Sequence, residues 1–184
     1  MNRKRGIISL GGIILALLMV GNLAAISSDN ATIGASAGFE GAEVRQDNEA
    51  DFLNAKIKEC TGSDESEAKR EKCVDEALDT CIDTYQSTAG QVACIRTATD
   101  IWEKKMNAAF NELTAKMDGE QGKALSVAQE SWKRSIEADL DLLYAIQGTG
   151  TMYVPMRAYQ KYEWVKGRAN TLQAFQQIYH ETNG

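Results

Sequence analysis

Apolar residues recur every three or four positions through the centre of the chain, which is the spacing of one face of an α-helix. The stripe consists of Val92, Ile95, Ala98, Trp102, Met106, Ala109, Phe110, Leu113 and Met117. Just upstream, Thr88 is followed three positions later by Gln91, the sequence signature of a capping box. The pattern therefore predicts a long helix from about Ala89 to Met117.

Two shorter patterns of the same period precede this helix. Apolar residues between Asp51 and Cys60 predict a short helix. Ser63-Asp64-Glu65 combines an N-cap residue with an acidic first turn, and it predicts the start of a second helix that reaches about Thr84. The inner face of that second helix is expected to carry Cys73, Ala77, Leu78, Cys81, Ile82 and Tyr85.

Two further helices are predicted after the central one. A turn at residues 118–122 precedes a helix from about Gly122 to Ile146, and Pro155 fits the first turn of the last helix. The first of these has the stripe Leu125, Ala128, Trp132, Ile136, Leu140, Leu143 and Ile146. The last has Met156, Tyr159, Tyr162, Val165, Ala169, Leu172, Phe175 and Tyr179. Since no segment alternates convincingly at period two, the sequence predicts an all-α fold, an antiparallel bundle of four or five helices.

The three tryptophans and one glycine refine this expectation. Trp102 and Trp132 fall on the inner stripes and are expected in the core, whereas Trp164 is next to a stripe and is expected to be partly exposed. Gly167 interrupts the last helix, at a cost of about 1 kcal/mol relative to alanine.

Four cysteines, an even number, fit a disulfide framework in an oxidising compartment. Three pairings are possible, but Cys60–Cys73 and Cys81–Cys94 each enclose twelve residues, and the repeated spacing favours these two local pairs. Cys73 and Cys81 are about 12 Å apart along one predicted helix, too far to bridge each other. A zinc site is the alternative. It is disfavoured because the spacing is not that of zinc ligands and His180 is remote, so no metal and no cofactor is expected.

The central stretch also resembles a known family. A cysteine pair leads into a helix that reads roughly "LN..Y..L", and the next helix carries an "AQ..W" signature. The matching residues are Cys81, Cys94, Met106-Asn107, Phe110 and Leu113, then Leu125, Ala128-Gln129 and Trp132. In these features the stretch from Cys81 to Phe175 resembles the lysozyme inhibitor LprI-like N-terminal domain family.

The chain departs from the family pattern after Trp132. The family usually continues there into a Tyr-Arg-Asp/Glu run and a further cysteine, whereas this chain has Ser135, Ile136, Glu137 and Leu140, so it resembles a divergent member. The resemblance implies a helical domain, placed at residues 48–184, that engages a lysozyme-type muramidase and obstructs its cleft.

The N-terminal part predicts export. Residues 2–5 are basic, and the 21 residues from Gly6 to Ile26 carry no charge, so residues 1–26 are expected to form a signal peptide or, if uncleaved, a membrane anchor. Residues 27–47 are rich in small and polar residues and are expected to form a flexible linker. The predicted location is periplasmic or secreted, with an inner-membrane anchor and an external domain as the alternative.

The net charge of the chain limits the kinds of macromolecule that it is expected to bind. The formal net charge is −6. Without the three basic residues at positions 3–5, 17 basic residues stand against 26 acidic ones, a charge of −9. Such a chain is a poor candidate for nucleic-acid binding, and it suits a cationic lysozyme or another basic envelope protein better.

No catalytic constellation is apparent, and the sequence therefore predicts a binding protein rather than an enzyme. His180 has no obvious partner for a triad, and the carboxylates of Glu137, Asp139 and Asp141 are split over different faces of a helix. The loop from Gln147 to Pro155 combines small, hydroxylic and aromatic residues, a composition that fits a contact surface, although an ordinary connection between helices is the favoured alternative. Its candidate contact residues are Thr149, Thr151, Met152 and Tyr153. The predicted function is inhibition of a lysozyme-type muramidase, and the alternative is an envelope structural or interaction module.

Overall fold

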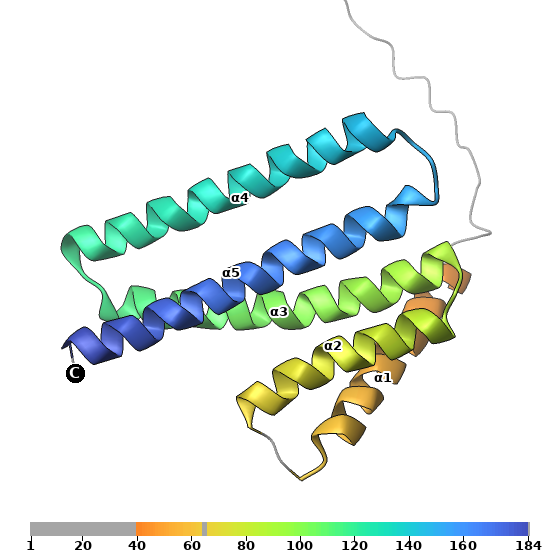
Figure 1. The fold of residues 1–184 in the computed structure, drawn as a ribbon, viewed down its shortest axis with the longest axis horizontal. Coiled ribbons are helices and arrows are strands. Elements are labelled where there is room, and N and C mark those ends of the chain that lie inside the picture. The colour runs from red at the N-terminus through yellow and green to blue at the C-terminus, as the bar shows by residue number, and fades with distance from the viewer. Residues whose placement is uncertain (1–39, 64–65, 184) are drawn as a thin grey trace, which may run out of the picture. The chain divides into compact units, whose positions relative to one another are not determined.

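The computed structural model describes residues 40–63 and 66–183, and this part of the chain forms five α-helices and no strand (Figure 1). The helices are α1 (Glu40–Thr61), α2 (Glu67–Thr84), α3 (Thr88–Lys116), α4 (Gly119–Gln147) and α5 (Tyr153–Asn183). Successive helices run in opposite directions, so the predicted all-α antiparallel bundle is confirmed. The predicted signal peptide or anchor lies outside the described residues. Among the helices that are described, none combines the length and apolarity needed to cross a membrane.

Helix α1 is longer than the sequence pattern predicts. It begins at Glu40 rather than near Asp51, so residues 40–47 of the predicted linker are helical. The early turns lack an apolar stripe, but Glu, Ala, Arg and Gln are good helix formers and extend the helix without one.

Both predicted disulfides are present, and they join the first three helices. Cys60–Cys73 connects the end of α1 to α2 with a Cα–Cα distance of 5.7 Å. Cys81–Cys94 connects α2 to the first turns of α3 with a Cα–Cα distance of 5.9 Å. Three of the four cysteines are fully buried, and only Cys60 is partly exposed. These links hold α1, α2 and α3 together as one block.

The start of α3 differs from the predicted capping box. The N-cap is Ser87, whose Oγ accepts a hydrogen bond from the Gly90 amide at 3.0 Å, and Thr88 is already helical. A Cβ atom on Gly90 would lie 2.8 Å from Cβ of Tyr85, so the chain before the helix packs directly against its first turn. This close packing fixes the cap one residue earlier. Likewise, α2 has its N-cap at Ser66 rather than at Ser63.

Helix α3 is the centre of the core, and α5 runs beside it in the same direction (Figure 1). Trp102 is 1% exposed and packs among apolar residues of α1, α2 and α5. The stripe of α5 is buried only in its middle, because Met156 and Tyr159 at one end and Phe175 at the other remain exposed. The fully or nearly fully buried side chains of α5 are Tyr162, Val165, Ala169 and Leu172.

Helix α4 packs on α5 and α3 but buries little of its predicted stripe. Leu125 and Ile136 are buried, as is Gln129, which the stripe did not include. Ala128 and Ile146 are exposed, and Leu140, Leu143 and Trp132 are only partly buried. The expectation that Trp132 belongs fully to the core is therefore wrong; Trp132 packs against the edge of the core.

Candidate partner-binding surface

The loop between α4 and α5 is a short, internally bonded turn. Gly148 ends α4 with a φ of 67°, a conformation that suits glycine, and its amide donates to the Tyr144 carbonyl at 2.9 Å. The amides of Tyr153 and Val154 donate back to the carbonyls of Gly150 and Thr151, each at 3.1 Å. These bonds give the loop a defined shape.

Arg157 ties this loop to α5. Its side chain is buried, and its Nη1 donates to the Gly148 carbonyl at 3.2 Å and to Gln147 Oε1 at 3.4 Å. The guanidinium carbon lies 4.1 Å from the centre of the Tyr144 ring, within cation–π distance. The sequence patterns did not single out Arg157, because its partners are set by how α4 and α5 meet.

The four predicted contact residues have two different environments. Thr149 and Thr151 are exposed, and Met152 is 68% exposed. Tyr153 is half-buried, because its ring lies against Gly150, where a Cβ atom would come within 3.1 Å of Tyr153 Cδ2. Three of the four side chains are therefore available to a partner, whereas the Tyr153 ring packs against the loop itself.

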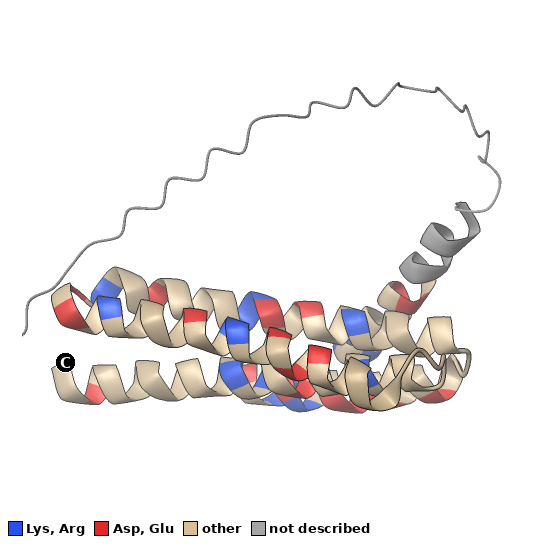
Figure 2. Cartoon of the chain, turned by 90° about the horizontal axis from the view of Figure 1, so that it is seen from above, with Lys and Arg blue, Asp and Glu red and all other residues tan. Residues whose placement is uncertain are grey.

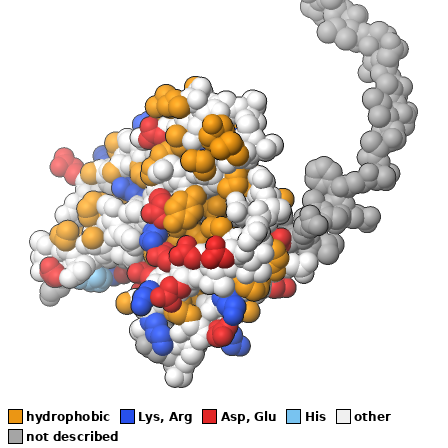
Figure 3. All heavy atoms as spheres, turned by 45° about the vertical axis from the view of Figure 1, so that its right-hand side comes forward, with side chains coloured by type: hydrophobic (Ala, Val, Ile, Leu, Met, Phe, Trp, Pro, Cys, Tyr) orange, Lys and Arg blue, Asp and Glu red, His pale blue; other side chains and the backbone are white. Residues whose placement is uncertain are grey.

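Large apolar side chains around the loop are also exposed. The sequence patterns placed several of them inside the bundle or passed over them. The exposed residues are Leu142, Tyr144, Ile146, Met156 and Tyr159. Together with the loop residues 148–152, they form what we call the hairpin surface. Seen from the side of the α4–α5 loop, hydrophobic side chains gather on the molecule with acidic ones beside them (Figure 3).

The segment that leads into the hairpin surface carries only acidic charge. From residue 135 to residue 156 the chain carries Glu137, Asp139 and Asp141 and no basic residue. All three carboxylates are exposed, and none forms an ion pair with another part of the chain that the structure describes. Elsewhere basic and acidic residues are interleaved along the helices (Figure 2).

An apolar groove with a volume of 440 Å³ lies at the opposite end of the α4–α5 pair. Met117, Leu125, Phe175 and Ile178 are among its lining residues. Lys116 and Glu112 of α3 meet His180 of α5 at this end, with distances of 3.0 and 3.6 Å to its Nε2. His180 therefore has a cation and a carboxylate beside it, which its position in the sequence did not reveal.

A polar cluster joins α2, α3 and α5 near the core. The Tyr162 hydroxyl donates to Asp75, and Lys166 Nζ lies 2.5 Å from the other Asp75 oxygen. Lys166 and Lys105 lie 5.8 and 4.9 Å from the Trp102 ring centre. Burial first, and then the Asp75 carboxylate, raise the pKa of Tyr162 well above its ordinary value, so its hydroxyl stays protonated. The cluster links the helices rather than forming an accessible reaction centre.

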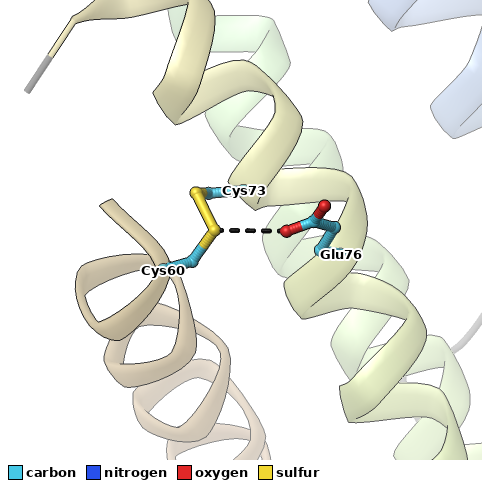
Figure 4. Close-up of side chains that lie close together, drawn as sticks. All are labelled: Cys60, Cys73 and Glu76. Atoms are coloured by element: carbon cyan, nitrogen blue, oxygen red, sulfur yellow. Dashed lines mark hydrogen bonds between the residues drawn. A yellow bond between two sulfur atoms is a disulfide. The ribbon is translucent and has the colours of Figure 1, made fainter. Parts of the chain in front are cut away.

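Cys60, Cys73 and Glu76 lie close enough together to suggest a metal site (Figure 4). Cys60 Sγ is 3.3 Å from Glu76 Oε2. A disulfide sulfur carries no proton and is not a thiolate, so it neither donates a hydrogen bond nor supplies the usual metal ligand. The group is a structural link between α1 and α2.

Comparison with known proteins supports a family assignment. The family model described as lysozyme inhibitor LprI matches residues 81–172, half of the chain. No curated protein matches, and no solved structure matches either. The matched residues run from the second disulfide through α3 and α4 to the buried part of α5, the same framework that carries the sequence resemblance. The chain belongs to the LprI lysozyme inhibitor family.

Proposed function

We propose that this protein inhibits a cationic lysozyme-type muramidase outside the cytoplasm, and that the hairpin surface is the part that meets the enzyme. Membership of the LprI family is the observation that carries the inhibitory function. The assignment of the hairpin surface is supported by its exposure, its apolar and aromatic side chains and its shape.

The hairpin surface has the composition of a binding surface. Aromatic residues and methionine are enriched at protein interfaces, and Tyr144, Met152 and Met156 are each more than half exposed. Arg157 holds the loop through two hydrogen bonds. A loop that is already ordered loses less conformational entropy when it binds, so this link supports tight binding.

Electrostatics suit a basic partner. Glu137, Asp139 and Asp141 form no ion pair within the described chain, and residues 135–156 contain no basic residue. Complementary charge mainly accelerates association and makes it sensitive to salt. Inhibition of a cationic enzyme should therefore weaken as salt is added, chiefly through slower association.

Two disulfides in a domain of this size support a location outside the cytoplasm, because such bonds persist in oxidising compartments. The N-terminal segment supports the same location as a prediction from sequence.

The test is a muramidase assay with purified protein at low and high salt. Combined replacement of Thr149, Thr151 and Met152 by alanine should raise the inhibition constant by about tenfold or more, the effect of losing about 1.4 kcal/mol or more of interface energy. The matched control is Val127→Ala with Ile178→Ala. Both residues are exposed and apolar but lie at the other end of the α4–α5 pair, and the control should inhibit like the parent protein. Circular dichroism of each variant checks that the helices are intact.

One result would remove the proposal. If micromolar protein leaves several classes of lysozyme fully active at low salt, the envelope-module function replaces inhibition.

A further inference from the structure

A polar groove with a volume of 430 Å³ lies between α4 and α5, next to the hairpin surface. The lining residues of α4 follow helical spacing from Trp132 to Asp139, and those of α5 do so from Trp164 to Thr171. One face of each helix is therefore turned toward the other without closing the space between them.

Gly167 keeps this space open. A Cβ atom at Gly167 would meet nothing within 4 Å, although the residue is in the middle of a helix that approaches α4. The glycine is therefore not needed for close helix packing. A larger side chain at this position would extend into the groove.

The groove already accommodates one positive charge. Arg168 lines it, and its guanidinium carbon lies 5.8 Å from the Trp132 ring centre. Arg168 Nε donates to Gln129 Oε1 at 2.9 Å, whereas its Nη2 is buried with no acceptor among the described residues. Burial lowers the pKa of Arg168 from its ordinary value, but a guanidinium stays charged at neutral pH.

Three of the other lining groups have no charged or aromatic partner within the described chain. The Trp164 ring has no ring or cation partner there, and the carboxylates of Asp139 and Glu163 form no ion pair there. A groove lined by an indole and by two carboxylates without an ion pair can bind an ammonium or guanidinium group, through cation–π attraction and charge-assisted hydrogen bonds.

We propose that this groove accepts a lysine or arginine side chain of the cationic partner. The side chain lies along Trp164, over the space left by Gly167, and its charged end meets Asp139 and Glu163. The identity of the macromolecular partner rests on the proposed inhibitory function. The preference of the groove for a cationic side chain is independent of that function.

The position of the groove fits a partner that also covers the loop. Asp139 lies nine residues before Gly148 on α4, or about 14 Å along the helix axis. An enzyme of ordinary domain size can cover both. With Arg168 counted, Asp139 and Glu163 still leave the lining net negative, which disfavours a phosphate or a nucleic acid.

The first arm of the test uses small probes on the full protein. Nα-acetyl-lysine amide and Nα-acetyl-arginine amide are titrated at millimolar concentration while the backbone amide signals of Gly167 and Thr171 are followed by NMR. The neutral norleucine analogue and a chitin trisaccharide serve as comparison ligands. The basic amides should shift these signals, and the shifts should disappear in Asp139→Asn/Glu163→Gln.

The second arm measures the Kd of a cationic c-type lysozyme. Trp164→Ala and Gly167→Leu should each raise the Kd by about tenfold, the scale of one desolvated cation–π contact or its steric exclusion. Asn170→Leu is the size control on an exposed position of α5 outside the groove, and Asp51→Asn/Asp100→Asn changes the net charge as much as the groove double variant. Both controls should bind like the parent protein. Gly167→Leu should not lower the thermal midpoint, so that weaker binding is not a folding defect.

The outcomes separate the two proposals. Basic-amide shifts together with weaker lysozyme binding by the groove variants support the groove. If the parent protein binds lysozyme and the groove variants match it within twofold, the groove proposal is overturned and the inhibitory function stands. If lysozyme does not bind, the inhibitory function fails and the probe arm alone decides the chemistry of the groove. Shifts caused by the trisaccharide or the norleucine analogue but not by the basic amides would overturn it.

Discussion

Two regions of this molecule start from the same kind of sequence pattern and end with different packing. In the block of α1, α2, α3 and the middle of α5, apolar stripes are buried and two disulfides join neighbouring helices. In α4 and the ends of α5, stripes of equal regularity remain half-exposed. A helical period therefore identifies the apolar face of a helix, but it does not establish that another helix covers that face.

The difference has a physical cause. Helix α3 has neighbours on several sides, so most of its stripe is buried and only Val92, Phe110 and Met117 are partly buried. Helix α4 is the outer partner of α5 and α3, and a polar groove separates part of it from α5. The apolar surface left uncovered surrounds the loop that we assign to the partner. In this account the compact block supplies stability and the α4–α5 pair supplies binding.

The largest expected loss of folding stability is that of Trp102→Ala, and Trp132→Ala is the comparison. Trp102→Ala should destabilise the protein by about 3–5 kcal/mol, because the ring is fully buried in a packed core. Trp132→Ala should cost only about 1–2 kcal/mol, since its ring lies at the edge of the core. Chemical denaturation of the two variants measures both values. Equal losses would show that α4 is as tightly packed as α3.

The disulfides give the next largest effect. Replacing Cys81 and Cys94 by alanine should cost about 3 kcal/mol from the unfolded chain alone, and more because both side chains are buried. The Cys60–Cys73 disulfide closes a loop of the same length, but Cys60 is partly exposed, so replacing this pair by alanine should cost less. Thermal unfolding of the two double variants under oxidising conditions ranks them. The reverse ranking would contradict the claim that the disulfide between α2 and α3 stabilises the protein more than the disulfide between α1 and α2.

The smallest expected changes in stability are those of two glycine-to-alanine variants, and they should have opposite signs. Gly167→Ala should stabilise the protein by about 1 kcal/mol, because alanine is the better helix former and its Cβ meets nothing. Gly90→Ala should destabilise it by about 1–3 kcal/mol through overpacking, because its Cβ would lie 2.8 Å from Tyr85 Cβ. Relative to the parent protein, the denaturation midpoint should rise in Gly167→Ala and fall in Gly90→Ala. A loss of stability in both variants would mean that the groove is closed in solution.

Much of the fold follows from local chemistry that a sequence displays. The period of α3, the turn before α4 and Pro155 in the first turn of α5 predict helix boundaries within a few residues, and the equal cysteine spacing predicts both disulfides. The start of α1 was not predicted, because its first turns are held by helix propensity without an apolar stripe.

The candidate site was less predictable, for a different reason. The loop residues Thr149, Thr151 and Met152 could be selected by composition and exposure alone. Arg157 could not, because it acts through the carbonyl of Gly148 and the ring of Tyr144 across a helix pair. The groove beside Trp164 depends in the same way on how two helices face each other. Such features require the tertiary arrangement.

The most direct test of the division between a stabilising block and a binding hairpin is hydrogen exchange with and without a cationic lysozyme. On complex formation, amides of the loop residues 148–152 and of the adjoining turns of α4 and α5 should exchange more slowly. Amides of α1 and α2 should exchange at the same rate as in the free protein. Protection confined to α1 and α2, with an unchanged α4–α5 loop, would contradict the assignment of the hairpin surface.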